Sequence, residues 1–152
     1  MNKANRKVLL LVEDDPNDVL FLQMAAKKAG LTLPLHVVKD GYDAIAYLDG
    51  QGAYADRALH PVPCLVLLDM KLPRVMGLEV LKWIRERPAF QTTIVIILTS
   101  SQQPADILRS YALGANAYLV KPSDPAALSG MMDAVNRFWL TFNYPTAAGG
   151  EE

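Results

Sequence analysis

The chain has 152 residues, of which 51% are hydrophobic and 20% are charged, and its net charge is −1. This composition is typical of one soluble globular domain and excludes a disordered, collagen-like or disulfide-built chain. The balanced charge argues against a nucleic-acid partner, which would favour a clustered basic surface. The single cysteine, Cys64, fits a reducing compartment, and no hydrophobic run approaches the roughly 18 residues of a membrane helix. We therefore expect a cytoplasmic protein without a membrane segment.

Short hydrophobic runs alternate along the chain with longer amphipathic segments. The runs predict strands at residues 8–12, 35–38, 64–68, 94–98 and 117–120. The amphipathic segments predict helices at residues 18–29, 42–48, 77–86, 104–113 and 125–142. Most runs are hydrophobic throughout, as parallel strands buried on both faces are. The pattern therefore predicts an α/β fold with a doubly wound, five-stranded parallel sheet and helices on both faces.

Local signals refine the ends of these elements. Asp15 is expected to cap the first helix with Pro16 at its first position, and Gly30 stands where the helix should end. Residues 50–63 are rich in turn formers and predict a long loop. We expect residues 1–144 to form one domain and residues 145–152 to form a disordered tail.

Polar side chains follow four of the predicted strands, at the edge of the sheet where open parallel sheets bind ligands. These are Glu13, Asp14 and Asp15 after the first strand, Asp69 after the third, Thr99 after the fourth and Lys121 after the fifth. Clustered carboxylates repel one another unless a cation lies among them, and oxygen ligands suit Mg²⁺. A lysine and a hydroxyl can bind phosphoryl oxygens. The set predicts phosphoryl transfer to a carboxylate.

The segments VLLLVEDD, LVLLDMKLPRVMG, IVIILTSS and AYLVKP, in this order, resemble the receiver domain of two-component response regulators, the chemotaxis-regulator-like family. The third-strand segment is the most specific, with a proline four residues and a glycine eight residues after its aspartate. The resemblance runs from about residue 7 to residue 140. It implies a flavodoxin-like sheet in the strand order 2-1-3-4-5.

Position by position, the resemblance implies a role for each polar residue at the strand ends. Asp69 would be the phosphoacceptor. Asp14 would bind Mg²⁺ directly, Glu13 would bind it mostly through water, and the backbone carbonyl of Lys71 would be a further ligand. No other cofactor is implied.

Three further residues match the switch elements of the family. Thr99 would hydrogen-bond a phosphoryl oxygen, and Lys121 would pair with another one. The resemblance implies a cis Lys121–Pro122 peptide bond, which the chain can hold because the cis form of such a bond is only about 0.5–1 kcal/mol less stable than trans. Tyr118 would be the aromatic residue whose rotamer reports phosphorylation.

The implied function is that of a single-domain response regulator, which accepts a phosphoryl group from the phosphohistidine of a sensor histidine kinase. It would then switch a protein–protein contact with an unknown downstream protein or relay the group onward. Beyond its own phosphorylation and dephosphorylation it would not act as an enzyme. The loop at residues 50–63 and the ending FWLTF resemble phytochrome-associated regulators, which implies a phytochrome as the kinase.

The last predicted helix carries a hydrophobic stripe at spacings of three and four. The stripe contains Leu128, Met131, Met132, Val135, Phe138, Trp139 and Phe142. At about 27 Å the helix is longer than the strands beneath it, so Trp139, Phe142 and Tyr144 should overhang the sheet. These aromatics either fold back over their own domain or form a homodimer, of which we expect the dimer.

Three other functions remain alternatives. An aspartyl-phosphate hydrolase would need a second acid two residues after Asp69, where Lys71 stands. A flavodoxin-like cofactor binder would need a phosphate-binding loop after the first strand, where acidic residues stand instead. A pseudo-receiver would bind partners without being phosphorylated, although every acidic and basic element is present.

Overall fold

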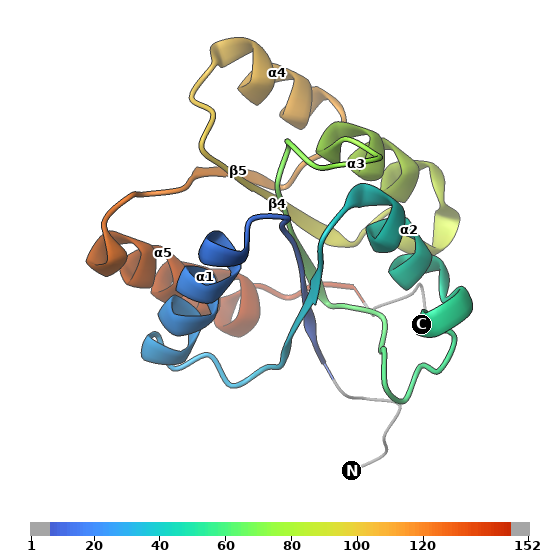
Figure 1. Cartoon of the computed structure of the whole chain (residues 1–152), viewed down its shortest axis with the longest axis horizontal. Coiled ribbons are helices and arrows are strands. Elements are labelled where there is room, and N and C mark those ends of the chain that lie inside the picture. The colour runs from blue at the N-terminus through green and yellow to red at the C-terminus, as the bar shows by residue number, and fades with distance from the viewer. Residues whose placement is uncertain (1–6, 147–152) are drawn as a thin grey trace.

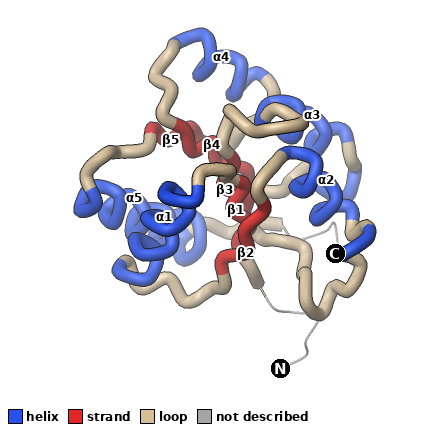
Figure 2. The backbone as a smooth tube through the Cα atoms, viewed as in Figure 1, coloured by secondary structure: helices blue, strands red, loops and turns tan. Residues whose placement is uncertain are grey.

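A computed structural model describes residues 7–146 of the chain. Its single sheet contains five parallel strands, and their order is β2-β1-β3-β4-β5 (Figure 2). The strands are β1 (Leu9–Val12), β2 (Leu35–Val38), β3 (Leu65–Leu68), β4 (Ile94–Thr99) and β5 (Ala117–Val120). Both the predicted order and the predicted strands are confirmed, each to within one residue at either end.

Five α-helices cover the two faces of the sheet (Figure 1). They are α1 (Pro16–Lys28), α2 (Gly41–Asp49), α3 (Gly77–Glu86), α4 (Pro104–Ala112) and α5 (Pro125–Arg137). Side chains of α1 and α5 form one hydrophobic core with one face of the strands. Side chains of α2 and α3 form a second core with the opposite face. The doubly wound architecture is therefore confirmed.

The first helix begins as the sequence signals indicate, two residues before the predicted start. The Asp15 carboxylate caps it by accepting hydrogen bonds from the backbone N–H groups of Asn17, at 2.8 Å, and Asp18. Pro16 occupies the first helical position, where its missing N–H leaves no hydrogen bond unmade. Gly30 ends the helix with a φ of 78°. These contacts set where α1 begins and where it ends.

The last helix is not one α-helix to residue 142, so this prediction was wrong. It is α-helical to Arg137, and Phe138–Phe142 continue as a π-helix. Within this turn the N–H of Asn143 donates to the carbonyl of Phe138, and the hydroxyl of Thr141 donates to the carbonyl of Asn136. Both bonds span five residues, and the backbone bond from Asn143 to Phe138 is the π-helical one, in place of the four-residue bond of an α-helix.

The predicted loop at residues 50–63 contains only a short 3-10 turn at Gly52–Tyr54. Of the predicted disordered tail, residues 145 and 146 are described, and the Thr146 hydroxyl lies 2.6 Å from that of Thr92. Residues 147–152 lie outside the described residues. Between residues 7 and 146, no helix is long and hydrophobic enough to cross a membrane.

Candidate functional site

Strand register brings the predicted site residues to one edge of the sheet. Val12 at the end of β1 lies opposite Val38 and Leu68, the last residues of β2 and β3. The residues that follow are held by backbone bonds that continue the ladder: Glu13 N–H donates to Val38, and Asp69 N–H donates to Val12. Two acids 56 positions apart thereby become neighbours.

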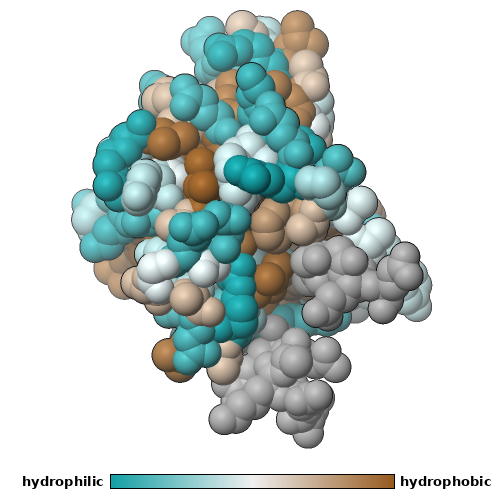
Figure 3. Space-filling view, turned by 90° about the vertical axis from the view of Figure 1, so that its right-hand side faces the viewer, coloured by the Kyte–Doolittle hydropathy of each residue, from teal (hydrophilic) through white to brown (hydrophobic). Residues whose placement is uncertain are grey.

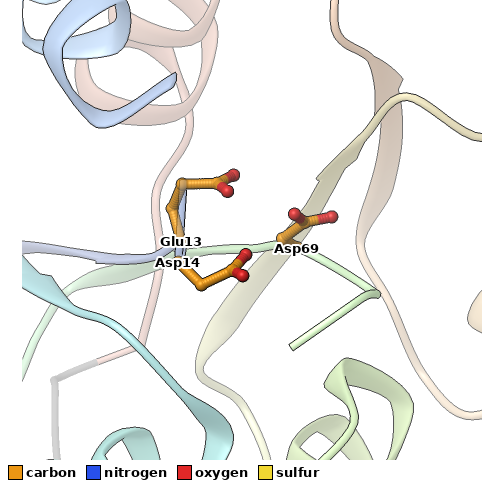
Figure 4. Close-up of side chains that lie close together, drawn as sticks. All are labelled: Glu13, Asp14 and Asp69. Carbon is orange, nitrogen blue, oxygen red and sulfur yellow. The ribbon is translucent and has the colours of Figure 1, made fainter. Parts of the chain in front are cut away.

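Glu13, Asp14 and Asp69 form an acidic trio (Figure 4). Each offers a carboxylate oxygen, and these oxygens all lie within 4.8 Å of one another. Glu13 is only 1% exposed and Asp69 only 8%, whereas Asp14 is exposed. Three carboxylates this close are stable together only if positive charge compensates them, and their oxygens are the ligands that Mg²⁺ prefers. The residues present therefore fit a divalent cation.

The ammonium group of Lys121 provides positive charge beside the trio. It donates hydrogen bonds to Glu13 Oε2, to Asp18 Oδ2 at 3.1 Å and to Asp69 Oδ2 at 3.3 Å. The lysine follows β5, and its backbone N–H donates to the carbonyl of Thr99 at 2.8 Å. Only 10% of its side chain is exposed. Lys121 is thus held over the end of the sheet rather than extended into solvent.

Burial and charge change the acidity of this pair. Burial raises the pKa of Glu13 to about 7; the negative charge of Asp69 acts in the same direction, while the hydrogen bond from Lys121 opposes it. Burial alone would lower the pKa of Lys121, but its hydrogen bond to Glu13 and the charge of Asp69 outweigh burial and raise it. The lysine therefore stays charged, and its hydrogen bond favours the ionised form of Glu13 against the effect of burial.

The backbone around Asp69 is tightly constrained. The N–H of Met70 donates to Asp69 Oδ1 at 2.7 Å, and the N–H of Gly77 donates to the carbonyl of Met70. A Cβ atom at Gly77 would lie 2.0 Å from the carbonyl oxygen of Asp69. The glycine eight residues after the aspartate is therefore needed so that α3 can begin against the backbone of Asp69.

The acidic trio and Lys121 line one cleft of about 660 Å³, together with Thr99 and Lys71. Thr99 is 2% exposed, at the end of β4. Tyr118 on β5 is half-buried, and its hydroxyl donates to the carbonyl of Ser101 at 2.9 Å. The arrangement offers a buried carboxylate, an ammonium, a hydroxyl and a candidate cation site within one cleft. Phosphoryl transfer to a carboxylate uses groups of these kinds.

Comparison with known proteins agrees with this geometry. The sequence profile of the response regulator receiver domain matches residues 9–133. The chain belongs to this family. It is 37% identical over 142 residues to the response regulator Rcp1 of Synechocystis sp., an alignment that covers 93% of this chain and 95% of Rcp1. The receiver is therefore a response regulator similar to Rcp1.

Two solved structures of similar sequence have the same fold as this receiver. The Mn(2+)-bound form of Rcp1 is 36% identical, with a TM-score of 0.83, over 93% of this chain and 99% of that one. The phosphorylated cyanobacterial phytochrome response regulator RcpA is 32% identical, with a TM-score of 0.86 and the same coverage. Neither the hydrolase nor the pseudo-receiver alternative is favoured by these relatives.

One expectation for the receiver is wrong in this structure: none of the peptide bonds in residues 7–146 is cis, so the Lys121–Pro122 bond is trans. A trans X–Pro bond is the lower-energy form. Lys121 reaches Glu13 and Asp69 with the bond trans.

Sequence reasoning missed one residue of the site, Asp18, and one loop contact near it, made by Arg74. Asp18 contacts Lys121, yet in the sequence it is simply the acidic residue in the first turn of a capped helix. Arg74 pairs with Asp40 at 2.9 Å and with Asp43 at 3.4 Å, which ties the β3–α3 loop to the start of α2. Arg74 has a φ of 65°, a conformation that no sequence signal indicated.

Proposed function

We propose that this receiver accepts a phosphoryl group on Asp69 from the phosphohistidine of a sensor histidine kinase. One observation carries the proposal: Lys121, from the far strand β5, donates to Asp69 while Asp69 belongs to an acidic trio that fits a divalent cation. Positive charge is thereby aimed at the atoms that would surround a transferred phosphoryl group.

In this proposal, one set of residues would hold the cation and another would bind the phosphoryl oxygens. Glu13, Asp14 and Asp69, with the backbone carbonyl of Lys71, would hold Mg²⁺, which supplies positive charge to the phosphoryl oxygens. The Mn(2+)-bound form of the similar regulator Rcp1 supports a divalent cation here. Lys121 and Thr99 would bind the remaining phosphoryl oxygens by an ion pair and a hydrogen bond.

The transfer balances without a further reagent. A carboxylate oxygen of Asp69 forms a bond to phosphorus, the phosphorus–nitrogen bond to histidine breaks, and the electron pair returns to the imidazole. Hydrolysis of the acyl phosphate by water regenerates Asp69. These two reactions are the only chemistry we assign to the protein.

The switch and the partners follow from the same proposal. Tyr118 connects β5 to the loop after β4 through its hydrogen bond to Ser101, so that a movement of Thr99 would reach it. The output would be a protein–protein contact or a relay step. The similarity to RcpA, a cyanobacterial phytochrome response regulator, supports a phytochrome as the kinase. The proposal includes a cytoplasmic setting, which the single cysteine, Cys64, fits. Residues 1–144 would form the receiver domain, with 145–152 as its tail.

Labelling with acetyl phosphate tests the proposal. With Mg²⁺ the protein should gain one phosphoryl group, visible as a mass increase that hydroxylamine removes because it attacks the acyl carbon. Asp69→Asn should not be labelled, whereas Asp49→Asn, at the exposed end of α2, should be labelled like wild type. Label that survives in Asp69→Asn would place the chemistry on another residue and end the assignment.

A further inference from the structure

A fourth acid lies beside Lys121, outside the acidic trio. Asp18 Oδ2 accepts a hydrogen bond from the Lys121 ammonium at 3.1 Å, a shorter contact than the 3.3 Å to Asp69. The Asp18 side chain is 38% exposed, compared with 1% for Glu13. It comes from α1, whereas Lys121 comes from the loop after β5, so this contact joins two elements at the rim of the cleft.

The three carboxylates around Lys121 are not equivalent. An ammonium group has three N–H donors, and here Glu13, Asp18 and Asp69 accept one each. Glu13 and Asp69 also belong to the trio whose oxygens lie within 4.8 Å of one another, and Asp18 does not. A divalent cation held by the trio would compete with Lys121 for the oxygens of Glu13 and Asp69 only.

The position of Asp18 does not depend on the cation. Its backbone N–H donates to the Asp15 cap at 3.4 Å, and it lies in the first turn of a helix of 13 residues. That turn also forms one wall of a hydrophobic groove of about 700 Å³ between α1 and α5, to which both Asp18 and Lys121 contribute. Asp18 therefore remains a partner for the ammonium whatever the trio binds.

We propose that Asp18 is a positioning residue, which retains the Lys121 ammonium at the rim of the site when a divalent cation draws Glu13 and Asp69 to itself. This inference rests on the metal site of the proposed function. Without Asp18, the ammonium has no acidic partner among residues 7–146 except the carboxylates that the cation needs. It then competes with the cation, and the affinity of the trio for the cation falls.

The test measures Mn²⁺ affinity by electron paramagnetic resonance of the free ion, in five proteins: wild type, Asp18→Asn, Asp18→Glu, Lys121→Ala and the double variant Asp18→Asn/Lys121→Ala. Asp18→Asn should weaken Mn²⁺ binding about threefold, the size expected for a half-exposed ion pair. Asp18→Glu should restore part of the affinity, because it keeps a carboxylate within reach of Lys121.

The double variant distinguishes a positioning role of Asp18 from a general effect of its negative charge on cation binding. Loss of a negative charge weakens cation binding in any background, so a purely electrostatic Asp18 would act equally with and without Lys121. Positioning predicts that Asp18→Asn has little further effect once Lys121 is alanine. An equal effect in both backgrounds, or no effect in the wild-type background, would overturn the inference alone. A wild type that binds no Mn²⁺ would instead overturn the metal site, and this inference with it.

Discussion

At the scale of single residues, His36 shows how a hydrogen bond decides which atom titrates. The Tyr47 hydroxyl lies 2.9 Å from both the carbonyl oxygen of Pro61 and Nδ1 of His36. A carbonyl can only accept, so Tyr47 donates its one proton to Pro61 and must accept from the Nδ1–H of His36. Nε2 is therefore the atom that gains a proton in acid. Burial, with the charge of His60, lowers the pKa of His36.

This arrangement predicts a loss of stability in mild acid. Because the pKa of His36 lies below 6.5 in the folded protein, the unfolded chain binds more protons as the pH falls through that value, and the free energy of unfolding decreases. His36→Asn keeps an N–H donor for Tyr47 without a titrating group. Between about pH 7.5 and about pH 5.5, the urea midpoint of His36→Asn should fall less than that of wild type.

All other titrating groups are common to the two proteins, so the difference between their midpoints isolates His36. A matching fall in both proteins would show that His36 keeps its ordinary pKa in the folded state.

At the scale of the elements, glycines in two helices have opposite requirements. Gly77 starts α3 where a Cβ atom would lie 2.0 Å from the backbone oxygen of Asp69. Gly130 lies within α5, exposed, and a Cβ atom there would meet nothing within 4 Å. Only the first of these glycines is required by packing, and it is the one next to the proposed phosphoacceptor, Asp69.

Alanine substitution should therefore change stability in opposite directions. Gly77→Ala should lower the free energy of unfolding by about 1–3 kcal/mol or more, because two backbones must separate. Gly130→Ala should raise it by about 0.5–1 kcal/mol through helix propensity. Chemical denaturation measures both, and acetyl phosphate labelling should be slower only in Gly77→Ala. If Gly77→Ala were as stable as wild type, the α3–β3 contact would have to be looser than described.

Sequence patterns were sufficient for the strands and for the polar residues that follow them, for physical reasons. A parallel strand buried on both faces must be hydrophobic throughout, so β1, β3 and β4 were predicted to within one residue at either end. The carboxyl ends of parallel strands lie at the same edge of the sheet, and this predicted that Glu13, Asp69 and Lys121 lie together. The helix caps at Asp15 and Gly30 depend on neighbouring residues only, which is why they too were predictable.

Contacts between distant loops could not be read in the same way. The guanidinium of Arg57 donates to the carbonyls of Tyr47 and Leu48 at the end of α2, and Arg85 donates to those of Thr93 and Gly114. No local sequence pattern indicates which distant backbone carbonyl an arginine in a loop or on a helix will contact. The Asp18–Lys121 contact spans 103 residues and was missed for the same reason.

At the scale of the whole molecule, exposed hydrophobic residues are scattered on one face but concentrated at the C-terminal turn. The face seen in Figure 3 is mainly hydrophilic, with hydrophobic residues in small separate groups. Beyond residue 133, where the family profile ends, three aromatics within seven residues are exposed: Phe138 at 53%, Phe142 at 73% and Tyr144 at 99%. Trp139, by contrast, packs against the core of α1 and α5, so its predicted place in the overhang is wrong.

The π-helical turn accounts for this division. It continues the direction of α5 while Trp139 and Leu140 contact the hydrophobic core, and it leaves Phe138 and Phe142 on the outside. Folding back therefore explains Trp139 but not the other aromatics. Clustered exposed aromatics usually mark an interface, and a twofold dimer is the commonest way to cover such a patch. We therefore propose a homodimer through Phe142, with Phe138 and Tyr144 beside it.

Charge at the centre of this patch should separate the two copies. Phe142→Glu would bury a carboxylate against a hydrophobic partner, so the dimer should dissociate at micromolar concentrations while Asp69 is still labelled by acetyl phosphate. The side chain of Leu108 on α4 is about as exposed as that of Phe142, so Leu108→Glu is the matched control and should remain dimeric. Light scattering measures both masses, with and without acetyl phosphate. A wild type that is monomeric in both conditions would exclude the dimer, and a monomeric Leu108→Glu would move the interface to α4. Because Phe142 is 73% exposed, Phe142→Glu should keep the circular dichroism and unfolding midpoint of wild type, which separates loss of the dimer from loss of the fold.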